Sequence, residues 1–122
     1  MIWMKIGVCF SLLSVIIGAF GAHGIKDSLI KNDTVDVFNT SVKYHIFHSL
    51  AILITAILQL LGYLNSTIPI ISFIIGILLF SGSLYILSYT GIKWLGAITP
   101  IGGIFFIIGW ITLFIFLRSS PH

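Results

Sequence analysis

The sequence contains very little charge. Only 7% of its 122 residues are charged, and the acidic residues are three aspartates with no glutamate. A soluble domain carries roughly 25% charged residues, so this chain cannot cover a water-exposed surface. Its net charge of +3 is too sparse for the basic stripe that nucleic-acid binding requires. The composition therefore excludes a soluble globular domain and a nucleic-acid-binding module.

Cysteine is almost absent as well, because Cys9 is the single one in the chain. One cysteine cannot form a disulfide within the chain, which excludes a small disulfide scaffold. Apolar residues are abundant instead: 58% of the chain is hydrophobic and 14% is aromatic, and there are 12 glycines. This composition is typical of helices packed in a lipid bilayer. The sequence predicts an integral membrane protein whose first partner is the bilayer.

Uncharged stretches divide the chain into four spans. About 20 apolar residues cross the hydrocarbon core, and the charge-free stretches are 6–25, 44–92 and 94–117. The middle stretch has room for two spans, and the polar run 65–67 before Pro69 marks the turn between them. We therefore predict an all-α membrane protein, a single domain over residues 1–122 that forms a compact four-helix bundle. Its predicted helices are residues 5–25, 34–64, 68–90 and 95–117.

The one extended polar segment is 26–43, which holds all three aspartates. Asp33 can cap a helix that starts near Thr34, and Val35 and Phe38 then fall at helical spacing. We predict an amphipathic lead-in to the second helix. It either folds over the end of the bundle or lies in the membrane interface as a docking face.

The charges leave the orientation in the membrane open. With four spans both ends of the chain share one side, and that side carries Lys5 and Arg118. The opposite side carries Lys26, Lys31, Lys43 and Lys93. The positive-inside rule then favours termini outside, but a margin of four charges against two is too small to decide it.

Small residues recur on the predicted helices. Because lipid offers little hydrophobic drive between helices, close backbone contact over small residues replaces it. The glycines that we assign to helix packing are Gly18, Gly21, Gly76, Gly82, Gly102 and Gly103. The same faces could serve a homo-oligomer or a larger membrane complex, and one sequence does not separate these uses.

Thr99 and Pro100 stand together near the start of the fourth predicted helix. Pro100 has no backbone N–H and removes the hydrogen bond to Gly96, while the Thr99 hydroxyl can satisfy part of the local backbone. We predict a structural kink at this pair rather than a gate.

No catalytic pattern is visible. The spans contain no acid, which excludes a carboxylate pair or a proton relay of Asp and Glu within the membrane. The sequence also lacks a nucleophile elbow, a zinc-protease motif and a phosphate-binding loop. We therefore predict that the protein is not an enzyme and that it uses no cofactor.

Histidine and tyrosine are the remaining candidates for a site. His45 and His48 are three residues apart and Tyr44 precedes His48 by four, so a helix places them on one face near the membrane surface. His23 ends the first helix on the same side, and Tyr85 joins them if the third helix places it deep enough. One interpretation is a hydrogen-bonded polar cluster. The other is a site for haem, a transition metal, a quinone or a lipid headgroup, in which any metal falls to His23 and His48.

Four motifs, one in each predicted span, resemble a known family. They are GAFGAHG at 18–24, YHIFHSLA at 44–51, FSGSLY at 80–85, and ITPIGG at 98–103 leading to Gly109 and Trp110. In this order they resemble the bacterial small membrane proteins grouped as domain of unknown function 423. Mitochondrial transmembrane protein 256 belongs to the same superfamily. The resemblance covers nearly the whole chain and implies a four-helix protein of the bacterial inner membrane with no settled activity.

The resemblance also bears on the site. It implies that the position of His45 is often Gln in relatives, which weakens any site that needs both helix-two imidazoles. The residues and the resemblance together predict a non-enzymatic structural or accessory bundle. The alternative is a membrane protein that binds a ligand through the histidine and tyrosine cluster.

Overall fold

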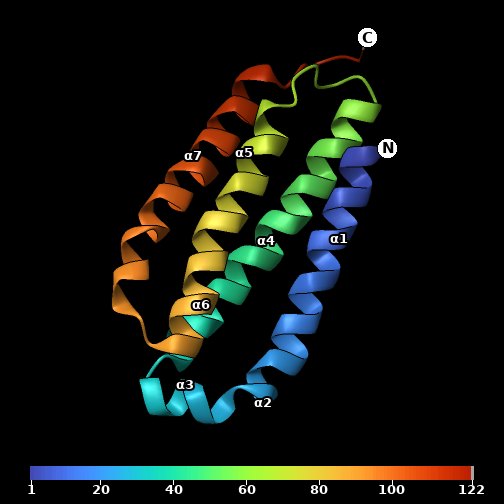
Figure 1. Ribbon diagram of the computed structural model, residues 1–122. Coiled ribbons are helices and arrows are strands. Elements are labelled where there is room, and N and C mark those ends of the chain that lie inside the picture. Colours follow the sequence, from blue (N-terminus) through green and yellow to red (C-terminus); the bar gives the residue numbers. More distant parts are fainter. Residues whose placement is uncertain (122) are drawn as a thin grey trace.

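The chain folds into four antiparallel helical rods joined by short connections, as Figure 1 shows for the computed structural model. The structure describes residues 1–121, without the side chain of Ala22. Four helical segments are long and apolar enough to cross a membrane: Ile2–Gly21, Val35–Leu60, Ile68–Thr90 and Lys93–Phe116. The prediction of an all-α membrane protein with four spans is therefore confirmed.

Each rod consists of one to three helical elements. Short π-helical turns, η1 and η2, interrupt the first and third rods, and a 3₁₀ turn, η3, opens the fourth. In chain order the elements are α1 (Ile2–Ile16), η1 (Ile17–Gly21), α2 (Ala22–Gly24), α3 (Lys26–Asn32), α4 (Val35–Leu60), α5 (Ile68–Gly76), η2 (Ile77–Ser81), α6 (Gly82–Thr90), η3 (Lys93–Ala97) and α7 (Thr99–Phe116).

The helix ends differ from the prediction where the backbone turns. The first helix begins at Ile2 rather than at residue 5, because the Lys5 amide already donates to the Met1 carbonyl at 3.1 Å. The second helix ends at Leu60 rather than at 64. Gly62 follows with a φ of 86°, and a left-handed residue of this kind stops a helix.

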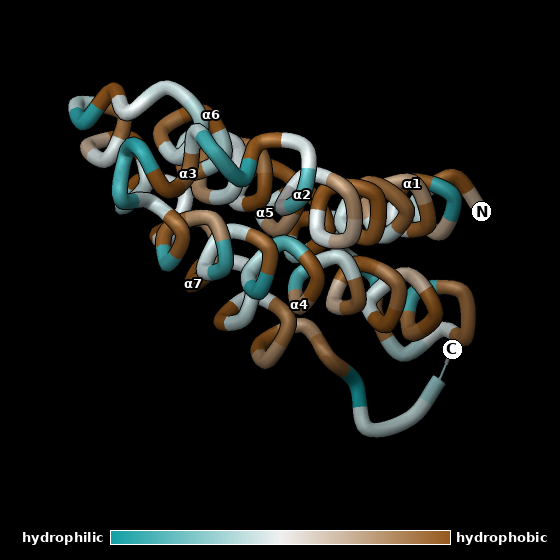
Figure 2. The backbone as a smooth tube through the Cα atoms, turned by 90° about the horizontal axis from the view of Figure 1, so that it is seen from below, coloured by the Kyte–Doolittle hydropathy of each residue, from teal (hydrophilic) through white to brown (hydrophobic). Residues whose placement is uncertain are grey.

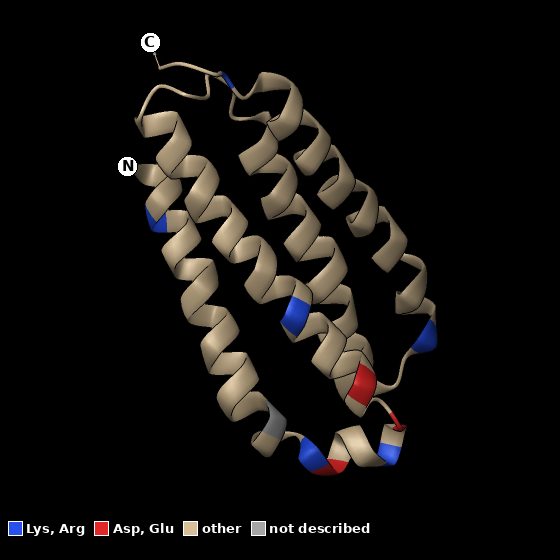
Figure 3. Ribbon diagram, turned by 180° about the vertical axis from the view of Figure 1, so that it is seen from behind, with Lys and Arg blue, Asp and Glu red and all other residues tan. Residues whose placement is uncertain are grey.

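Hydrophobic residues predominate along the rods, and α3 together with the first half of α4 carries most of the strongly hydrophilic residues (Figure 2). Figure 3 shows the acidic residues and most of the lysines at the end formed by α3, whereas the end with both termini carries few charges. At the α3 end, the Thr34 hydroxyl donates to the Ser88 carbonyl at 2.6 Å and the Asn32 amide donates to the Tyr89 carbonyl at 3.0 Å. These bonds satisfy carbonyls in the last turn of α6. The polar segment thus folds over the end of the bundle.

The hydrophobic core lies between α4, the third rod and α7. Its buried members are Ala51, Ile52, Ala56, Ile70, Phe73, Ile77 and Phe106. Ser41 and Ser81 tie α4 to the third rod through two reciprocal hydrogen bonds, in which each hydroxyl donates to the other residue's carbonyl at 2.8 and 3.0 Å. The rod formed by α1 packs mainly on α4, and its Trp3, Met4 and Phe10 pack against this core.

Glycines let α7 pack closely against the third rod. A Cβ on Gly102 would overlap the backbone nitrogen of Phe80, so the two backbones are in direct contact there. A Cβ on Gly76 would overlap the ring of Phe106. Such contacts are typical of helix packing in membranes, where small residues replace the missing hydrophobic drive.

The other glycines assigned to packing differ in their surroundings. A Cβ on Gly18 would lie 3.1 Å from Val42 and one on Gly21 would lie 3.4 Å from Phe38, so both residues face α4. Gly82 has no atom within 4 Å of its Cβ position, and the nearest atom to Gly103 is 3.9 Å away. These last two therefore do not mediate a close helix contact.

Pro100 lies in the first turn of α7 and not inside the helix. A proline is tolerated there because N–H groups of the first turn have no partner within the helix. The irregular backbone precedes it as η3. The break predicted at Thr99 and Pro100 thus takes the form of a change from 3₁₀ to α-helix, with the Thr99 hydroxyl 2.7 Å from that of Ser83.

Alanine at Gly102 should destabilise the bundle, whereas alanine at Gly103 should not. The added Cβ at Gly102 meets the Phe80 backbone, and overpacking of this kind costs about 1–3 kcal/mol. At Gly103 there is room, and alanine is favoured over glycine in a helix by roughly 0.5–1 kcal/mol. Unfolding with sodium dodecyl sulfate in mixed micelles, followed by circular dichroism, measures both. Equal stabilities of G102A and G103A would contradict the backbone contact.

Candidate functional site

The two histidines of α4 point toward different neighbours. His45 is 3% exposed, its Nδ1 lies 2.8 Å from the Tyr85 hydroxyl, and its ring meets the edge of Phe10. His48 is equally buried but stacks on Phe106, with ring centroids 3.6 Å apart. Residues three apart on a helix differ by about 60° in direction. Because of this difference, His45 contacts α6 and His48 contacts α7.

The predicted cluster is therefore divided into three places. Tyr44 and His48 lie together, with nearly parallel rings 6.0 Å apart. His45 pairs with Tyr85, and its Nε2 is buried without a hydrogen-bond partner among the described residues. His23 is exposed and lines a separate hollow of about 270 Å³ beside α3. Within residues 1–121, no three His, Cys, Asp or Glu side chains are grouped to share a metal ion.

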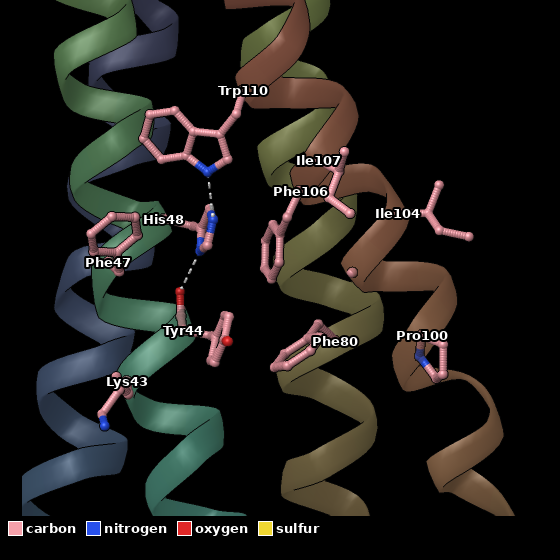
Figure 4. Close-up of a pocket in the computed structure, with 11 residues that line it drawn as sticks. Lys43, Tyr44, Phe47, His48, Phe80, Pro100, Ile104, Phe106, Ile107 and Trp110 are labelled. Carbon is pink, nitrogen blue, oxygen red and sulfur yellow. Dashed lines mark hydrogen bonds between the residues drawn. The ribbon is translucent and has the colours of Figure 1, made fainter.

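Hydrogen bonds at both ring nitrogens fix the protonation of His48 (Figure 4). Nδ1 lies 2.9 Å from the Tyr44 carbonyl, and because a carbonyl only accepts, Nδ1 carries the proton. The indole N–H of Trp110 donates to Nε2 at 3.1 Å, so Nε2 supplies its lone pair. The two bonds together require a neutral His48 protonated on Nδ1.

His48 also lies deeper than predicted. It is in the middle of α4, 13 residues after Val35, or about 20 Å along the helix axis. The sequence placed it near the membrane surface because the charge-free stretch begins at Tyr44, whereas in the fold it stacks on Phe106, near the middle of α7. A fully paired polar group at this depth satisfies the requirement that polar atoms within lipid find partners in the protein.

A groove of about 630 Å³ lies beside the bond between His48 and Trp110. Figure 4 shows its walls, with α4 on one side and α7 on the other. The residues that line it are Lys43, Tyr44, Phe47, His48, Phe80, Pro100, Gly103, Ile104, Phe106, Ile107 and Trp110. Phe47 and Ile104 on its rim are 57% and 55% exposed. Because these residues belong to membrane-spanning helices, the groove opens sideways toward lipid.

Aromatic rings form the inner wall of the groove. The rings of Tyr44 and Phe106 are inclined by 15° and those of His48 and Phe106 by 8°. The ring of Phe80 lies 4.5 Å from that of Tyr44, measured between centroids. Lys43 is the one charged residue in the lining, at the end of the groove nearer α3. The groove thus combines flat apolar walls with a cation at one end and the His48–Trp110 pair at the other.

Sequence reasoning missed the α7 side of this groove. Trp110 and Phe106 had no assigned role, because their meeting with His48 depends on the register between two helices that are distant in the chain. One signal was present in the sequence: an indole within an apolar span needs an acceptor for its N–H, and His48 was a candidate acceptor.

Comparison with known proteins identifies similar chains. A family described as a protein of unknown function, DUF423, matches residues 17–103. The UPF0382 membrane protein YwdK of Bacillus subtilis is 45% identical over 114 residues, covering 92% of each chain. A UPF0382 membrane protein of Haemophilus influenzae is 40% identical over 99 residues, covering 81% of this chain and 79% of the relative. No solved structure matches the chain.

The ¹⁵N resonances of histidine-labelled protein should show His48 neutral, with its proton on Nδ1. Trp110→Phe keeps an aromatic ring but removes the N–H donor, so the Nε2 resonance of His48 should move and His45 should not respond. The variant should lose about 0.6–1.7 kcal/mol of stability, from the average to the largest contribution of a hydrogen bond between membrane helices. Trp94→Phe in η3 is the matched control. A His48 proton on Nε2 would overturn the assignment.

Proposed function

The chain belongs to the DUF423 family of membrane proteins, and we propose that it is a non-enzymatic accessory protein that holds one membrane lipid between α4 and α7. The observation that carries the proposal is the lateral groove of about 630 Å³. Binding sites for small molecules typically measure about 300–1,000 Å³, with mainly apolar walls and a few polar groups. The groove has this composition and faces the lipid phase.

The position of the groove favours a ligand that is already in the membrane. Its rim consists of exposed apolar side chains, among them Phe47, Ile104 and Ile107. A water-soluble ligand would have to cross hydrocarbon to reach them, whereas a lipid enters by lateral diffusion. The aliphatic rim then contacts the tail, and the polar groups inside the groove contact the head.

Lys43 supplies an anchor for the head. Its side chain is exposed, and in Figure 4 its ammonium lies on the side of α4 away from α7, so the long, flexible side chain turns toward the groove to meet the head. A lysine on a membrane helix keeps its charged end near the interface while its stem packs on apolar surface. Since the residues that line the groove include no acid, the ammonium attracts an electron-rich head.

The same residues support binding rather than catalysis. A catalytic base needs a free nitrogen aimed at a nucleophile or at the substrate. Nε2 of His48 instead accepts from Trp110, and Nδ1 donates to Tyr44. Haem or a transition metal would have to displace Trp110, and neither His23 nor His45 faces His48 to complete a set of ligands. We therefore propose a role without haem or metal.

A homo-oligomer or a larger complex is a separate proposal. The glycines on the first rod, Gly18 and Gly21, face α4, and Gly76 and Gly102 join the third rod to α7. Four of the six glycines that the sequence could assign to either use are thus occupied within one chain, whereas Gly82 and Gly103 are not. The exposed faces of α1 and α7 suit contact with lipid and contact with another protein equally, so they do not favour an oligomer. The groove is the feature that distinguishes the two roles, and it supports the lipid site.

Filling the groove should release the lipid. Gly103 lines the groove and has room for a larger side chain, so Gly103→Leu places a branched chain where the ligand sits. Gly82→Leu is the matched control, because Gly82 also has open space but lies outside the groove. Native mass spectrometry of gently purified protein should find one lipid on the wild type and on G82L, and at least tenfold less on G103L. Equal retention by all three would refute the groove as the site.

A further inference from the structure

The hydrogen bond between Trp110 and His48 restricts which head can bind beside it. The indole N–H only donates, and in the Nδ1-protonated ring Nε2 only accepts. A ligand carbonyl that accepted from the indole N–H would leave Nε2 buried without a partner, which weakens binding. A ligand N–H that donated to Nε2 would leave the indole N–H of Trp110 without an acceptor.

A hydroxyl group is a simple head that avoids both losses. Its oxygen accepts from the Trp110 N–H while its hydrogen is donated to Nε2 of His48, so it inserts into the existing bond of 3.1 Å once the indole moves outward. Trp110 is 40% exposed and lines the groove, so its outer side is open to this movement, which loosens its contact with Phe73. The end of the groove formed by His48 and Trp110 is therefore suited to a hydroxylated ligand.

A second polar position lies one helical turn away along α4. Tyr44 and His48 are four residues apart, which is about 6 Å along the axis. The Tyr44 hydroxyl points into the groove and can donate to an oxygen at this end, and the Lys43 ammonium can do so once its side chain turns toward the groove. A ligand that uses both positions carries two oxygens on opposite sides of a small rigid unit.

The walls between these positions fit a flat ring. Phe80 and Phe106 both line the groove, and aromatic rings pack well in offset stacked or edge-on arrangements. Because Phe106 is already stacked on His48, a ligand ring meets its edge and packs on Phe80. The aliphatic rim formed by Ile104 and Ile107 continues toward lipid and suits an apolar tail. A phospholipid head fits less well, because a phosphate would face one lysine and a wall of aromatic carbon.

We infer that the groove binds a quinol, meaning a lipid with a dihydroxylated aromatic head and an isoprenoid tail. One hydroxyl lies between Trp110 and His48, and the other accepts from Lys43 and Tyr44. The inference rests on the proposed lipid-binding function and specifies the class of lipid. It concerns binding and invokes no transfer of electrons.

The test compares four ligands with the same short prenyl tail in detergent micelles. They are the quinol kept reduced under anaerobic conditions, its dimethyl ether, the corresponding quinone, and a prenol without a ring. The indole ¹H–¹⁵N resonance of Trp110 reports binding, and the indoles of Trp3 and Trp94 serve as internal controls. The quinol should bind about tenfold more tightly than the ether and the quinone, which is what one lost hydrogen bond costs at the upper end of its range.

Variants identify the group that makes this distinction. His48→Phe keeps a ring of similar size without an acceptor, so it should bind quinol and ether equally. Trp110→Phe leaves Nε2 available and should keep the preference for quinol, with bound ligand followed by equilibrium dialysis. Lys93→Gln, outside the groove, should behave as wild type. The comparison of ligands on the wild-type protein stands even if His48→Phe fails to fold.

The outcomes separate the two proposals. Equal binding of quinol, ether and prenol would overturn the quinol inference but leave the lipid site, because the groove would then recognise tails. No binding of any of the four, with another lipid retained on purified protein, would also overturn only the quinol inference. No binding together with no retained lipid would refute both.

Discussion

The contact between Gly102 and the backbone of Phe80 determines the geometry of the rest of the site. No other residue type allows α7 to approach the third rod so closely, since even one methyl group would overlap the Phe80 backbone. With α7 held against this rod, Trp110 lies two turns further along at the level of His48. The same contact draws α7 away from α4, and the space left between them is the groove. Phe80 takes part in both features, because its backbone meets Gly102 while its ring lines the groove.

The second constraint is that polar atoms inside a bilayer must be paired within the protein. His48 meets it completely, through the Tyr44 carbonyl and the Trp110 indole. Hydrogen bonds between membrane helices contribute only about 0.6 kcal/mol on average, so this one is weak enough for a ligand to open. A suitable ligand must then accept a hydrogen bond from the Trp110 indole and donate one to Nε2 of His48. This requirement makes the site selective for ligands that can do both.

The spans were predictable from the sequence because charge is so rare in this chain. The charged residues leave three long uncharged stretches, and the turn before Pro69 separates the second and third spans, although Lys5 and Lys43 lie inside α1 and α4. The caps of α6 by Asn32 and Thr34 were not predictable, since they join residues more than 50 positions apart. The C-terminal end of α4 was not predictable either, because it is set by the left-handed backbone of Gly62, which composition alone does not reveal.

The site was predictable only in part. Spacing brought Tyr44 and His48 together correctly, because residues four apart share a helix face. It also joined His45 to them, whereas the 60° between His45 and His48 sends the two rings to different neighbours. To predict that Phe106 and Trp110 contact His48, one needs the register between α4 and α7. This register is set by the glycine contacts and not by any local sequence pattern. Gly103 was assigned to packing by its residue type, and its place on the groove wall became apparent only from the arrangement of the helices.

The most direct test of a lipid held between α4 and α7 is photo-crosslinking in living cells. A photoreactive amino acid replaces Ile104 on the groove wall, and in a second strain it replaces Leu12 on the outer face of α1, which is exposed to a similar degree at 58% against 55%. Mass spectrometry then identifies the adducts. The account predicts one dominant lipid species from position 104 and a mixture that mirrors the bulk membrane from position 12. The same bulk mixture at both positions would contradict it.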